Sequence, residues 1–289
     1  MLVFITDLDG TLLDKAYSCD GAKSALSLLS QLRIPLVFCT SKTRAEVEAC
    51  RSTIGNEHPF IVENGGALYI PDCYFGRAIN APVRRNGYAV IEFGDCYSDL
   101  VKCLIDASEE SNCSVRGFHQ MSAEEVSGRC NLPLAAAHLA KKREYDEPFE
   151  ILGGEKKKLT DAIEKQKKRW TRGGTFYHIL GSNDKAHCVN LLTHFYTRIC
   201  DRVVTVGLGD GLNDAGFLNL VDIPVLLQSP EIETLKKAVP RGYSTKEPGP
   251  EGWNMAVHKI INQHLDKEGT AIGIRENTGT PYCPKAYRM

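Results

Sequence analysis

The chain begins Met1-Leu-Val-Phe-Ile-Thr-Asp7-Leu-Asp9-Gly10-Thr11-Leu-Leu13, and this stretch decides how the rest is interpreted. The apolar run at residues 2–6 leads directly into turn-forming residues, a pattern typical of a buried strand that ends in a loop. In strand-like geometry residues two apart point the same way, so the carboxylates of Asp7 and Asp9 share a side. Neighbouring anions repel unless one is protonated or a cation lies between them. An Asp-Gly dipeptide alone would indicate only a turn, but the whole string after a strand predicts a site.

Apolar runs and helical patterns alternate along both ends of the chain. Further buried strands are predicted at residues 34–39, 60–62, 203–206 and 223–227. Helices are predicted at 43–54, with Gly55 ending the helix, from Asn183-Asp184 to about 199, and at 250–265. This alternation predicts an α/β fold: a Rossmann-like parallel sheet covered by helices on both faces.

The pattern changes near Ala81-Pro82, where a long middle segment begins that has strands and helices of its own. We therefore expect a core formed by residues 1–82 and 183–265, with an α/β domain inserted at residues 83–182. Residues 266–289 are rich in Gly, Thr and Pro, with little apolar periodicity, and are expected to form a mobile tail.

Composition narrows the classes of function. The formal net charge of the 289 residues is -1, whereas a nucleic-acid binder is usually basic, so no nucleic-acid partner is expected. No apolar run is long enough to span a bilayer and no secretory signal precedes Asp7, so we expect a cytoplasmic protein without a membrane partner. Eleven cysteines without a Cys-x-x-Cys pair indicate buried, reduced thiols. The sequence predicts no oligomeric state.

Polar residues follow the predicted strands, and in an open α/β sheet ligands bind beyond the carboxyl ends of the strands. Asp210 follows the strand at 203–206, and Asp214 begins the next helix. Together with Asp7 and Asp9 they would form an oxygen-rich site suited to Mg²⁺. The string Gly207-x-Gly-Asp is not a phosphate-binding Walker loop, because no Gly-Lys-Ser/Thr follows it.

Lys185 stands at a predicted helix start, where a cation opposes the helix dipole unless an anion is held there. We therefore expect Lys185 to bind a phosphoryl oxygen. The alternative is that Lys185 is an ordinary solvated lysine. Thr40 offers a hydroxyl group at a strand end; its alternative role is to cap the next helix.

These strings, in this order, resemble the haloacid dehalogenase-like phosphatases: Asp7-Leu-Asp-Gly-Thr-Leu-Leu, Thr40, Lys185 and Gly-Asp210-Gly-Leu-Asn-Asp214. The resemblance covers residues 1 to 265, and the insertion looks like the large α/β cap of their sugar-phosphatase branch. Further strings are similar to the mannosyl-3-phosphoglycerate phosphatase family: 41–46 (Ser-Lys-Thr-Arg-Ala-Glu), 59–67, 143–149 (Arg-Glu-Tyr-Asp-Glu-Pro-Phe), 173–178 and 250–253.

The resemblance implies an Mg²⁺-dependent phosphatase in which Asp7 attacks phosphorus and becomes an aspartyl phosphate. Asp9 would protonate the leaving glycerate oxygen and then activate water. Mg²⁺ would be held by Asp7, the backbone carbonyl of Asp9 and Asp210, with Asp214 in support. Lys185 would neutralise charge on the transferring group, and Thr40 would position it.

The cap is then expected to recognise a small phosphorylated sugar-glycerate substrate. Arg143 is the expected ligand of the substrate carboxylate, since a guanidinium binds carboxylates in a bidentate way; alternatively it is a basic residue at a helix end. Other expected contacts to the substrate are Ser41, Lys42, Thr43, Glu63, Asn64, Glu144, Glu147, His178 and Asn213.

The sequence alone leaves alternative functions open. One is a phosphatase for the glucosyl analogue, or a broader sugar-phosphate phosphatase or phosphomutase of the same superfamily. A receiver-like domain that accepts phosphate on an aspartate is a non-enzyme alternative, against which stand Asp9, Asp210, Asp214 and the insertion. A nucleic-acid module built on the basic residues at 156–172 is a third, although such a run is usually a solvated face.

Overall fold

A nine-stranded sheet forms the larger part of the molecule. The computed structural model describes residues 1–76, 81–173 and 175–268. The strand order is β13-β12-β11-β1-β2-β3-β4-β6-β5. From β13 to β3 the strands pair in parallel, whereas β4, β6 and β5 pair antiparallel at one edge. The strand bounds are β1 Leu2–Thr6, β2 Leu36–Cys39, β3 Phe60–Val62, β4 Ala67–Pro71, β5 Val83–Arg85, β6 Tyr88–Glu92, β11 Val204–Gly209, β12 Ile223–Leu226 and β13 Tyr243–Ser244.

Helices cover both faces of this sheet, which confirms the predicted Rossmann-like α/β core. One face carries α1 (Lys23–Gln31), α2 (Arg44–Ile54) and α10 (Gly249–Glu268); the other carries α7 (Lys185–Thr197), α8 (Ala215–Leu218) and α9 (Ile232–Ala238). Leu2 and Phe4 of β1 point into the first cluster, and Val3 and Ile5 into the second. Because both faces are buried, β1 is a continuous apolar run rather than an alternating one.

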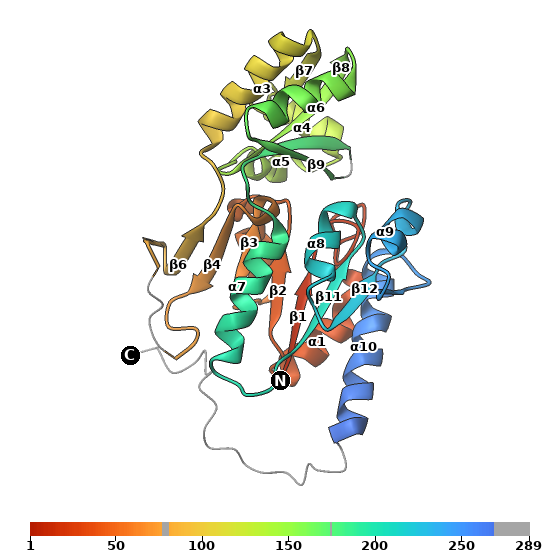
Figure 1. The fold of residues 1–289 in the computed structure, drawn as a ribbon. Coiled ribbons are helices and arrows are strands. Elements are labelled where there is room, and N and C mark those ends of the chain that lie inside the picture. Colours follow the sequence, from red (N-terminus) through yellow and green to blue (C-terminus); the bar gives the residue numbers. More distant parts are fainter. Residues whose placement is uncertain (77–80, 174, 269–289) are drawn as a thin grey trace.

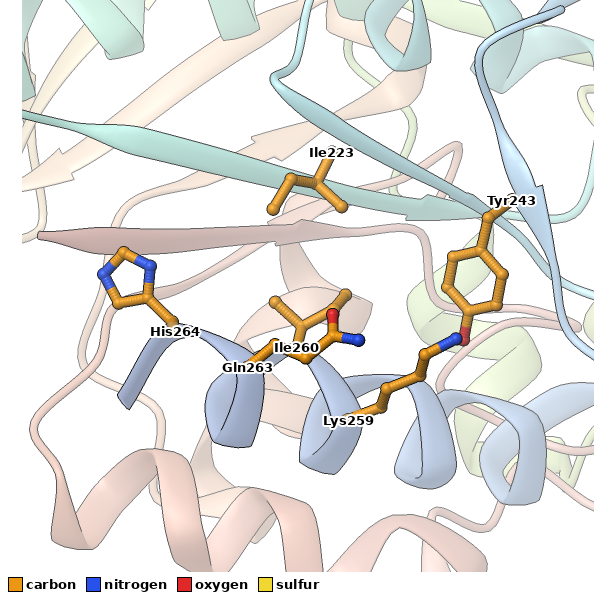
Figure 2. Close-up of a pocket in the computed structure, with 6 residues that line it drawn as sticks. All are labelled: Ile223, Tyr243, Lys259, Ile260, Gln263 and His264. Atoms are coloured by element: carbon orange, nitrogen blue, oxygen red, sulfur yellow. The ribbon is translucent and has the colours of Figure 1, made fainter. Parts of the chain in front are cut away.

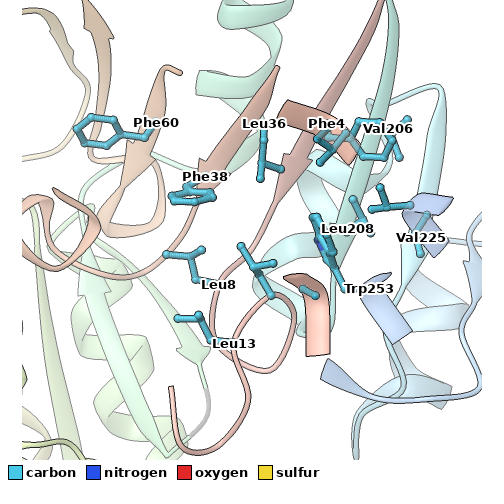
Figure 3. Packing of buried hydrophobic residues seen from close by; sticks show 14 of the residues in the cluster. Phe4, Leu8, Leu13, Leu36, Phe38, Phe60, Val206, Leu208, Val225 and Trp253 are labelled. Carbon is cyan, nitrogen blue, oxygen red and sulfur yellow. The ribbon is translucent and has the colours of Figure 1, made fainter. Parts of the chain in front are cut away.

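Trp253 of α10 anchors the first cluster. Its ring is fully buried beside Phe4, Val206 and Leu208 (Figure 3). The indole N–H donates a hydrogen bond of 3.0 Å to Oγ1 of Thr6, the last residue of β1. A buried indole needs such a partner for its polar atom. The packing therefore fixes the end of β1, directly before Asp7.

A second sheet, in the order β7-β8-β10-β9, forms a separate layer above the ends of the core strands (Figure 1). We call residues 97–180 the cap. Helices α3 and α6 pack on one face of this sheet, and α4 and α5 pack against the other. The bounds are α3 Tyr97–Ser111, β7 Ser114–Gly117, α4 Ala123–Cys130, α5 Leu134–Ala140, β8 Asp146–Gly153, α6 Lys156–Lys165, β9 Arg169–Gly173 and β10 Phe176–Leu180. Single 3₁₀ turns occur at Asp20–Ala22, Glu63–Gly65 and Leu212–Asp214.

Two predicted boundaries differ from the structure. Residues 83–92 were expected in the inserted domain, but β5 and β6 pair with the core sheet through β4. Asn86 and Gly87, both with positive φ, allow the tight turn that joins them. The tail was expected from residue 266, whereas α10 continues to Glu268. The rest of that segment, 269–289, lies outside the described residues.

A pocket in the core lies away from the carboxyl ends of the strands. It is lined by Ile223, Tyr243, Lys259, Ile260, Gln263 and His264, between the sheet edge and α10 (Figure 2). Ile223 is the first residue of β12, so this pocket opens near the amino end of that strand. Among the described residues, no helix is both long and apolar enough to cross a membrane.

Candidate active site

Three carboxylates meet where β1 and β11 end. These strands are parallel neighbours with Thr6 opposite Leu208, so Asp7 and the loop after Gly209 emerge side by side. Oxygen atoms of Asp7, Asp210 and Asp214 all lie within 4.8 Å of one another. The sequence prediction that these residues come together is therefore met by the geometry.

Burial and mutual repulsion act on this cluster. Burial raises the pKa of Asp7, and Asp214 and Asp210 add to the rise, while Lys185 opposes it. Burial, followed by the charge of Asp214, raises the pKa of Asp210 to about 7. A divalent cation would relieve this repulsion, and carboxylate oxygens are the donors that Mg²⁺ prefers. The donor set therefore fits Mg²⁺.

The surrounding loop holds the carboxylates in place. Thr11 donates a hydrogen bond of 2.9 Å from Oγ1 to Oδ1 of Asp210. Oδ2 of Asp214 accepts the backbone N–H groups of Asp210 and Gly211, at 3.2 and 3.1 Å. Gly10 has φ +73°, and a Cβ there would lie 2.5 Å from Oδ2 of Asp210. Only glycine fits at that position, which explains the Asp9-Gly10 step.

Lys185 is the first residue of α7, and its side chain is buried inside the cluster. Its Nζ lies 2.6 Å from Oδ1 of Asp7 and 2.7 Å from Oδ1 of Asp214. Burial alone would lower the pKa of Lys185, but Asp214 and Asp7 outweigh it and raise the pKa. Asp184 caps the helix by accepting the backbone N–H of His187 at 2.7 Å. The alternative of a solvated lysine is therefore wrong.

Asp9 lies apart from the three clustered carboxylates. Its Oδ1 is 3.0 Å from Nζ of Lys42, which also lies 3.3 Å from Glu46 and above the ring of Tyr17. Burial opposes the charge of Lys42, but Asp9 and Glu46 raise its pKa. The predicted metal contact of Asp9 was through its backbone carbonyl, and that role stays a prediction. Lys42 neutralises Asp9 and Glu46, and its expected contact to substrate stays a prediction.

Thr40 and Ser41 follow β2, which lies next to β1 in the sheet. Thr40 is fully buried, and its Oγ1 accepts the backbone N–H of Lys42 at 3.2 Å. The helix that follows is capped by Thr43, not by Thr40. Oγ1 of Thr43 accepts the N–H of Glu46 and donates to the carbonyl of Leu139 in the cap, at 3.2 and 3.0 Å. The Thr43 hydroxyl thus has two partners within the protein, and its expected contact to substrate stays a prediction.

Glu63 joins the core to the cap. Its carboxylate accepts the backbone N–H groups of Glu144, Tyr145 and Asp146, at 2.7–3.1 Å. Burial and the charge of Asp146 raise the pKa of Glu63 to about 8. Glu63 and Asn64 both have positive φ, 46° and 55°, a conformation that costs energy outside glycine. The side chain of Glu63 therefore binds the cap backbone, and its expected contact to the sugar stays a prediction.

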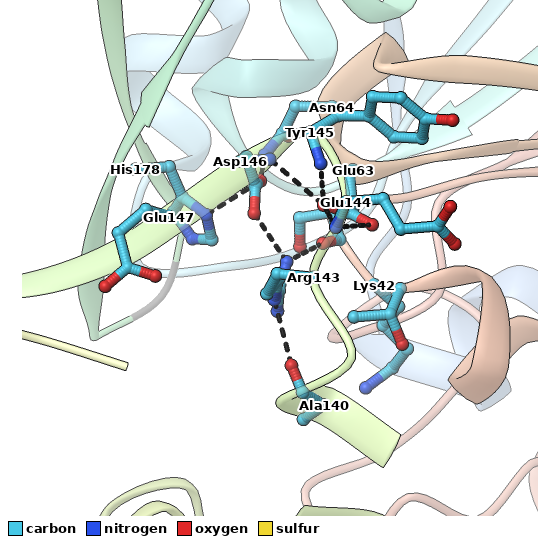
Figure 4. Close-up of polar contacts among 12 residues, drawn as sticks. Lys42, Glu63, Asn64, Ala140, Arg143, Glu144, Tyr145, Asp146, Glu147 and His178 are labelled. Carbon is cyan, nitrogen blue, oxygen red and sulfur yellow. Dashed lines mark hydrogen bonds and ion pairs between the residues drawn. The ribbon is translucent and has the colours of Figure 1, made fainter. Parts of the chain in front are cut away.

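Arg143 is also engaged within the protein. Nη1 donates to Oδ1 of Asp146 at 2.6 Å and to the carbonyl of Ser41 at 2.7 Å, while Nε donates to the carbonyl of Ala140 at 3.0 Å (Figure 4). Ala140 is the last residue of α5, so the helix-end alternative describes part of its role. Through Nη1, Arg143 ties the cap to the loop after β2. Its expected contact to the substrate carboxylate stays a prediction.

Two further glutamates that were expected at the substrate have protein partners. Glu144 pairs with Arg44 at 3.2 Å and with Arg85 at 2.6 Å. Glu147 is fully buried, accepting the Tyr97 hydroxyl at 2.8 Å and contacting Nδ1 of His119 at 2.6 Å. No pattern in the sequence separates these two glutamates from substrate ligands, because their basic and hydroxyl partners come together only in the tertiary fold.

His178 and Asn213 come together through a residue that the sequence interpretation missed. Asp146 is fully buried; its Oδ2 lies 3.0 Å from Nδ1 of His178 and accepts Nδ2 of Asn64 at 2.9 Å (Figure 4). Oδ1 of Asn64 in turn accepts Nδ2 of Asn213 at 3.3 Å. Asp146 stands within the Arg-Glu-Tyr-Asp-Glu-Pro-Phe string, which was the only signal pointing to it.

The basic run at 156–172 is interleaved with acidic partners. Lys157 pairs with Asp161, Lys165 with Glu110, Lys168 with Asp95 and Arg169 with Asp184, at 2.5–3.2 Å. Lys156 lies above the rings of Trp170 and Tyr177. A field that attracts phosphate backbones needs unneutralised basic charge, so this face gives the nucleic-acid alternative no support.

Comparisons with known proteins define the class. The family model described as haloacid dehalogenase-like hydrolase matches residues 4–80. A solved haloacid dehalogenase-like hydrolase from Bacteroides thetaiotaomicron has the same fold, with a TM-score of 0.61 at 14% identity over 89% of this chain and 98% of that one. At 14% identity this likeness shows the fold alone. The receiver-like alternative is removed by two phosphatase relatives.

Two curated relatives show to which family of these hydrolases the chain belongs. The glucosyl-3-phosphoglycerate/mannosyl-3-phosphoglycerate phosphatase of Methanococcoides burtonii is 41% identical over 91% of this chain and 98% of its own length. The mannosyl-3-phosphoglycerate phosphatase of Pyrococcus furiosus is 36% identical over 78% of this chain and 90% of its own length. The chain therefore belongs to the mannosyl-3-phosphoglycerate phosphatase family of the haloacid dehalogenase-like hydrolases.

Proposed function

We propose that this phosphatase hydrolyses the phosphate ester of a glycosyl-3-phosphoglycerate, mannosyl-3-phosphoglycerate or its glucosyl analogue, to glycosylglycerate and phosphate. The observation that carries the proposal is the clustering of Asp7, Asp210 and Asp214 around the buried Lys185. The relative that bears both the glucosyl and the mannosyl name aligns with the chain over 98% of its length. The cluster supports phosphoester hydrolysis, and the name of the relative favours a phosphorylated sugar-glycerate as the ester.

In this proposal Asp7 is the nucleophile. Its carboxylate oxygen attacks phosphorus, the bond to the glycerate oxygen breaks, and an aspartyl phosphate forms. Asp9 gives its proton to the leaving oxygen. It then takes a proton from the water that attacks phosphorus, which releases phosphate and restores Asp7. The ion pair with Lys42 positions the side chain of Asp9.

The remaining residues neutralise and orient the transferring group. Lys185 supplies a fixed positive charge beside Asp7, and Thr40 lies at the neighbouring strand end. Asp7, Asp210 and Asp214, with the backbone carbonyl of Asp9, would hold Mg²⁺. When bound, Mg²⁺ supplies further positive charge against the phosphoryl oxygens.

We also propose a division of labour between the two layers. The core, residues 1–93 and 183–268, carries the chemistry, and the cap recognises the glycosylglycerate part. The boundary follows the pairing of β5 and β6 with the core sheet. The ten cysteines in the described ranges are all free, which supports the expectation of a reducing compartment such as the cytoplasm.

A substrate panel tests the proposal. Phosphate release is measured with mannosyl-3-phosphoglycerate, glucosyl-3-phosphoglycerate, mannose phosphates and 3-phosphoglycerate, each with Mg²⁺. We expect kcat/KM for one or both glycosyl-3-phosphoglycerates to exceed that for the other esters by at least about 100-fold, since the cap contributes only when its ligand is present. Equal rates on mannose phosphates would favour the broader sugar-phosphate phosphatase instead.

A further inference from the structure

Asp146 fixes the polarity of a hydrogen-bond chain that crosses from cap to core. Burial opposes its ionisation, but the charge of Arg143, together with the hydrogen bonds from His178 and Asn64, lowers the pKa of Asp146. An ionised carboxylate can only accept hydrogen bonds. Nδ1 of His178 and Nδ2 of Asn64 must therefore both act as donors to Oδ2 of Asp146.

The directions of these two hydrogen bonds determine which atoms of His178 and Asn64 are left for further partners. In a neutral imidazole, a proton on Nδ1 leaves Nε2 as an acceptor. Asn64, having turned its amide N–H₂ towards Asp146, presents Oδ1 to Nδ2 of Asn213. Asn213 is thereby oriented as a donor, with a second N–H left on the same nitrogen. Within the described ranges, no residue makes a hydrogen bond to Nε2 of His178.

Gly173 brings this acceptor and this donor to one place. Gly173 lies on β9, whose neighbour β10 carries His178. A Cβ at Gly173 would lie 3.6 Å from Nε2 of His178 and 4.0 Å from Nδ2 of Asn213. Both groups thus border the small space beside Cα of Gly173, and that space adjoins the loop that carries Asp214.

We propose that this space is a hydroxyl-binding subsite for the sugar ring, with Nε2 of His178 as acceptor, Nδ2 of Asn213 as donor, and Asp146 as the residue that positions both. A hydroxyl group donates one hydrogen bond and accepts others, so an acceptor and a donor side by side match its chemistry. A carboxylate or phosphate, which only accepts, would be repelled by the lone pair of Nε2. The subsite rests on the proposed function and adds to it the position of the sugar.

Gly173→Ala tests whether the space beside Gly173 binds a hydroxyl group of the substrate, and it should change little else in the structure. Its Cβ would meet its neighbours at ordinary contact distances, so the fold should tolerate it. We expect KM for the glycosyl-3-phosphoglycerate to rise at least about tenfold, since a methyl group displaces a hydrogen-bonded hydroxyl. Turnover of p-nitrophenyl phosphate, an ester without a sugar, should stay within about twofold. Gly128→Ala is the matched control, because a Cβ at that cap glycine meets nothing within 4 Å.

Asp146→Asn tests whether Asp146 fixes the donor and acceptor directions in this hydrogen-bond chain. An amide at this position can donate to His178 and so remove the fixed acceptor at Nε2. We expect the same selective rise in KM, non-additive with Gly173→Ala because both act on one subsite. Asp222→Asn is the matched control: Asp222 accepts the N–H and Oγ1 of Thr205 at 2.8 Å within the core. Asp222→Asn should change thermal stability. It should not change the ratio between the KM for the glycosyl-3-phosphoglycerate and the KM for p-nitrophenyl phosphate.

The outcomes separate the subsite from the proposed function. If the wild type hydrolyses a glycosyl-3-phosphoglycerate but both variants keep KM within twofold, the subsite is wrong and the function stands. If the wild type prefers another sugar phosphate, the variants are compared on that ester, and a selective rise in its KM supports the subsite alone. A wild type that hydrolyses only sugar-free esters overturns both.

Discussion

Nζ of Lys185 lies 2.6 Å from Oδ1 of Asp7, although the two residues are 178 positions apart in the chain. The contact is buried and sits where β1 and α7 meet. It places a fixed cation against the residue that we propose as nucleophile. The same ammonium group contacts Asp214, so one lysine offsets the charge of two carboxylates.

Replacement of Lys185 by methionine should abolish most of the activity. Methionine has a similar length but no charge, so both Asp7 and the phosphoryl oxygens lose their cation. We expect kcat to fall by about 100-fold or more, as for other preorganised charges at a reaction centre. Steady-state phosphate release measures this, with Lys259→Met as the control beside the ring of Tyr243. A Lys185→Met enzyme within a few-fold of the wild-type kcat would remove Lys185 from the proposed site.

Chelation of divalent cations should abolish turnover, and Mg²⁺ should raise the thermal unfolding midpoint. Because only the folded state gathers the three carboxylates, Mg²⁺ at 100 times its Kd should add about 2.7 kcal/mol to the free energy of unfolding. Thermal unfolding with and without Mg²⁺ measures the shift. Asp210→Asn, which removes one ligand charge, should show a much smaller shift. An equal shift in both proteins would place the cation elsewhere.

The local features of this fold could be predicted from the sequence, because neighbouring residues create them. The run Leu2–Thr6 with Asp7 after it, and α2 with Gly55 as its left-handed end, both follow from spacing and residue type. The clustering of Asp7 with Asp210 follows from the rule that parallel strands end at one edge. Lys185 was predicted at a helix start, and the structure confirms that position.

The partners of the cap residues could not be predicted, since they depend on how distant segments pack. Glu144 was expected at the substrate, but one of its partners, Arg85, lies on β5, a short strand that the sequence pattern did not reveal. Asp146 was missed because a single carboxylate beside Arg143 carries no periodic signal. Only the contacts of Asn64 and His178 to Oδ2 of Asp146, beside that of Arg143 to Oδ1, show what it does.

Thr43 gives a test of a structural role against a substrate role. Loss of its hydroxyl removes the capping box with Glu46 and the bond to Leu139. We expect Thr43→Ala to lower the free energy of unfolding by about 1–2 kcal/mol, typical of a lost helix cap. Denaturant unfolding measures the change, with Thr53→Ala, an exposed position on the same helix, as control. A large rise in KM without loss of stability would restore Thr43 to the substrate contacts.

His58 should make stability depend on pH. Burial, and then the charge of Arg51, lower its pKa to about 4, below the value of about 6.5 expected in the unfolded chain. The unfolded state therefore binds the proton first as pH falls, so stability is full above about pH 6.5 and is lost towards pH 4. We expect a loss on the order of 2 kcal/mol that His58→Gln lacks. Unfolding curves at several pH values compare the two proteins, and identical pH profiles would contradict the assignment.

The most direct test of the central claim is phosphate release by Asp7→Asn. The substitution keeps the size of the side chain but removes the nucleophilic carboxylate. With a glycosyl-3-phosphoglycerate and Mg²⁺, the wild type should release phosphate, while Asp7→Asn should release it at least about 1,000-fold more slowly and stay folded. Full activity in Asp7→Asn would contradict the account, because phosphate transfer would then not pass through Asp7.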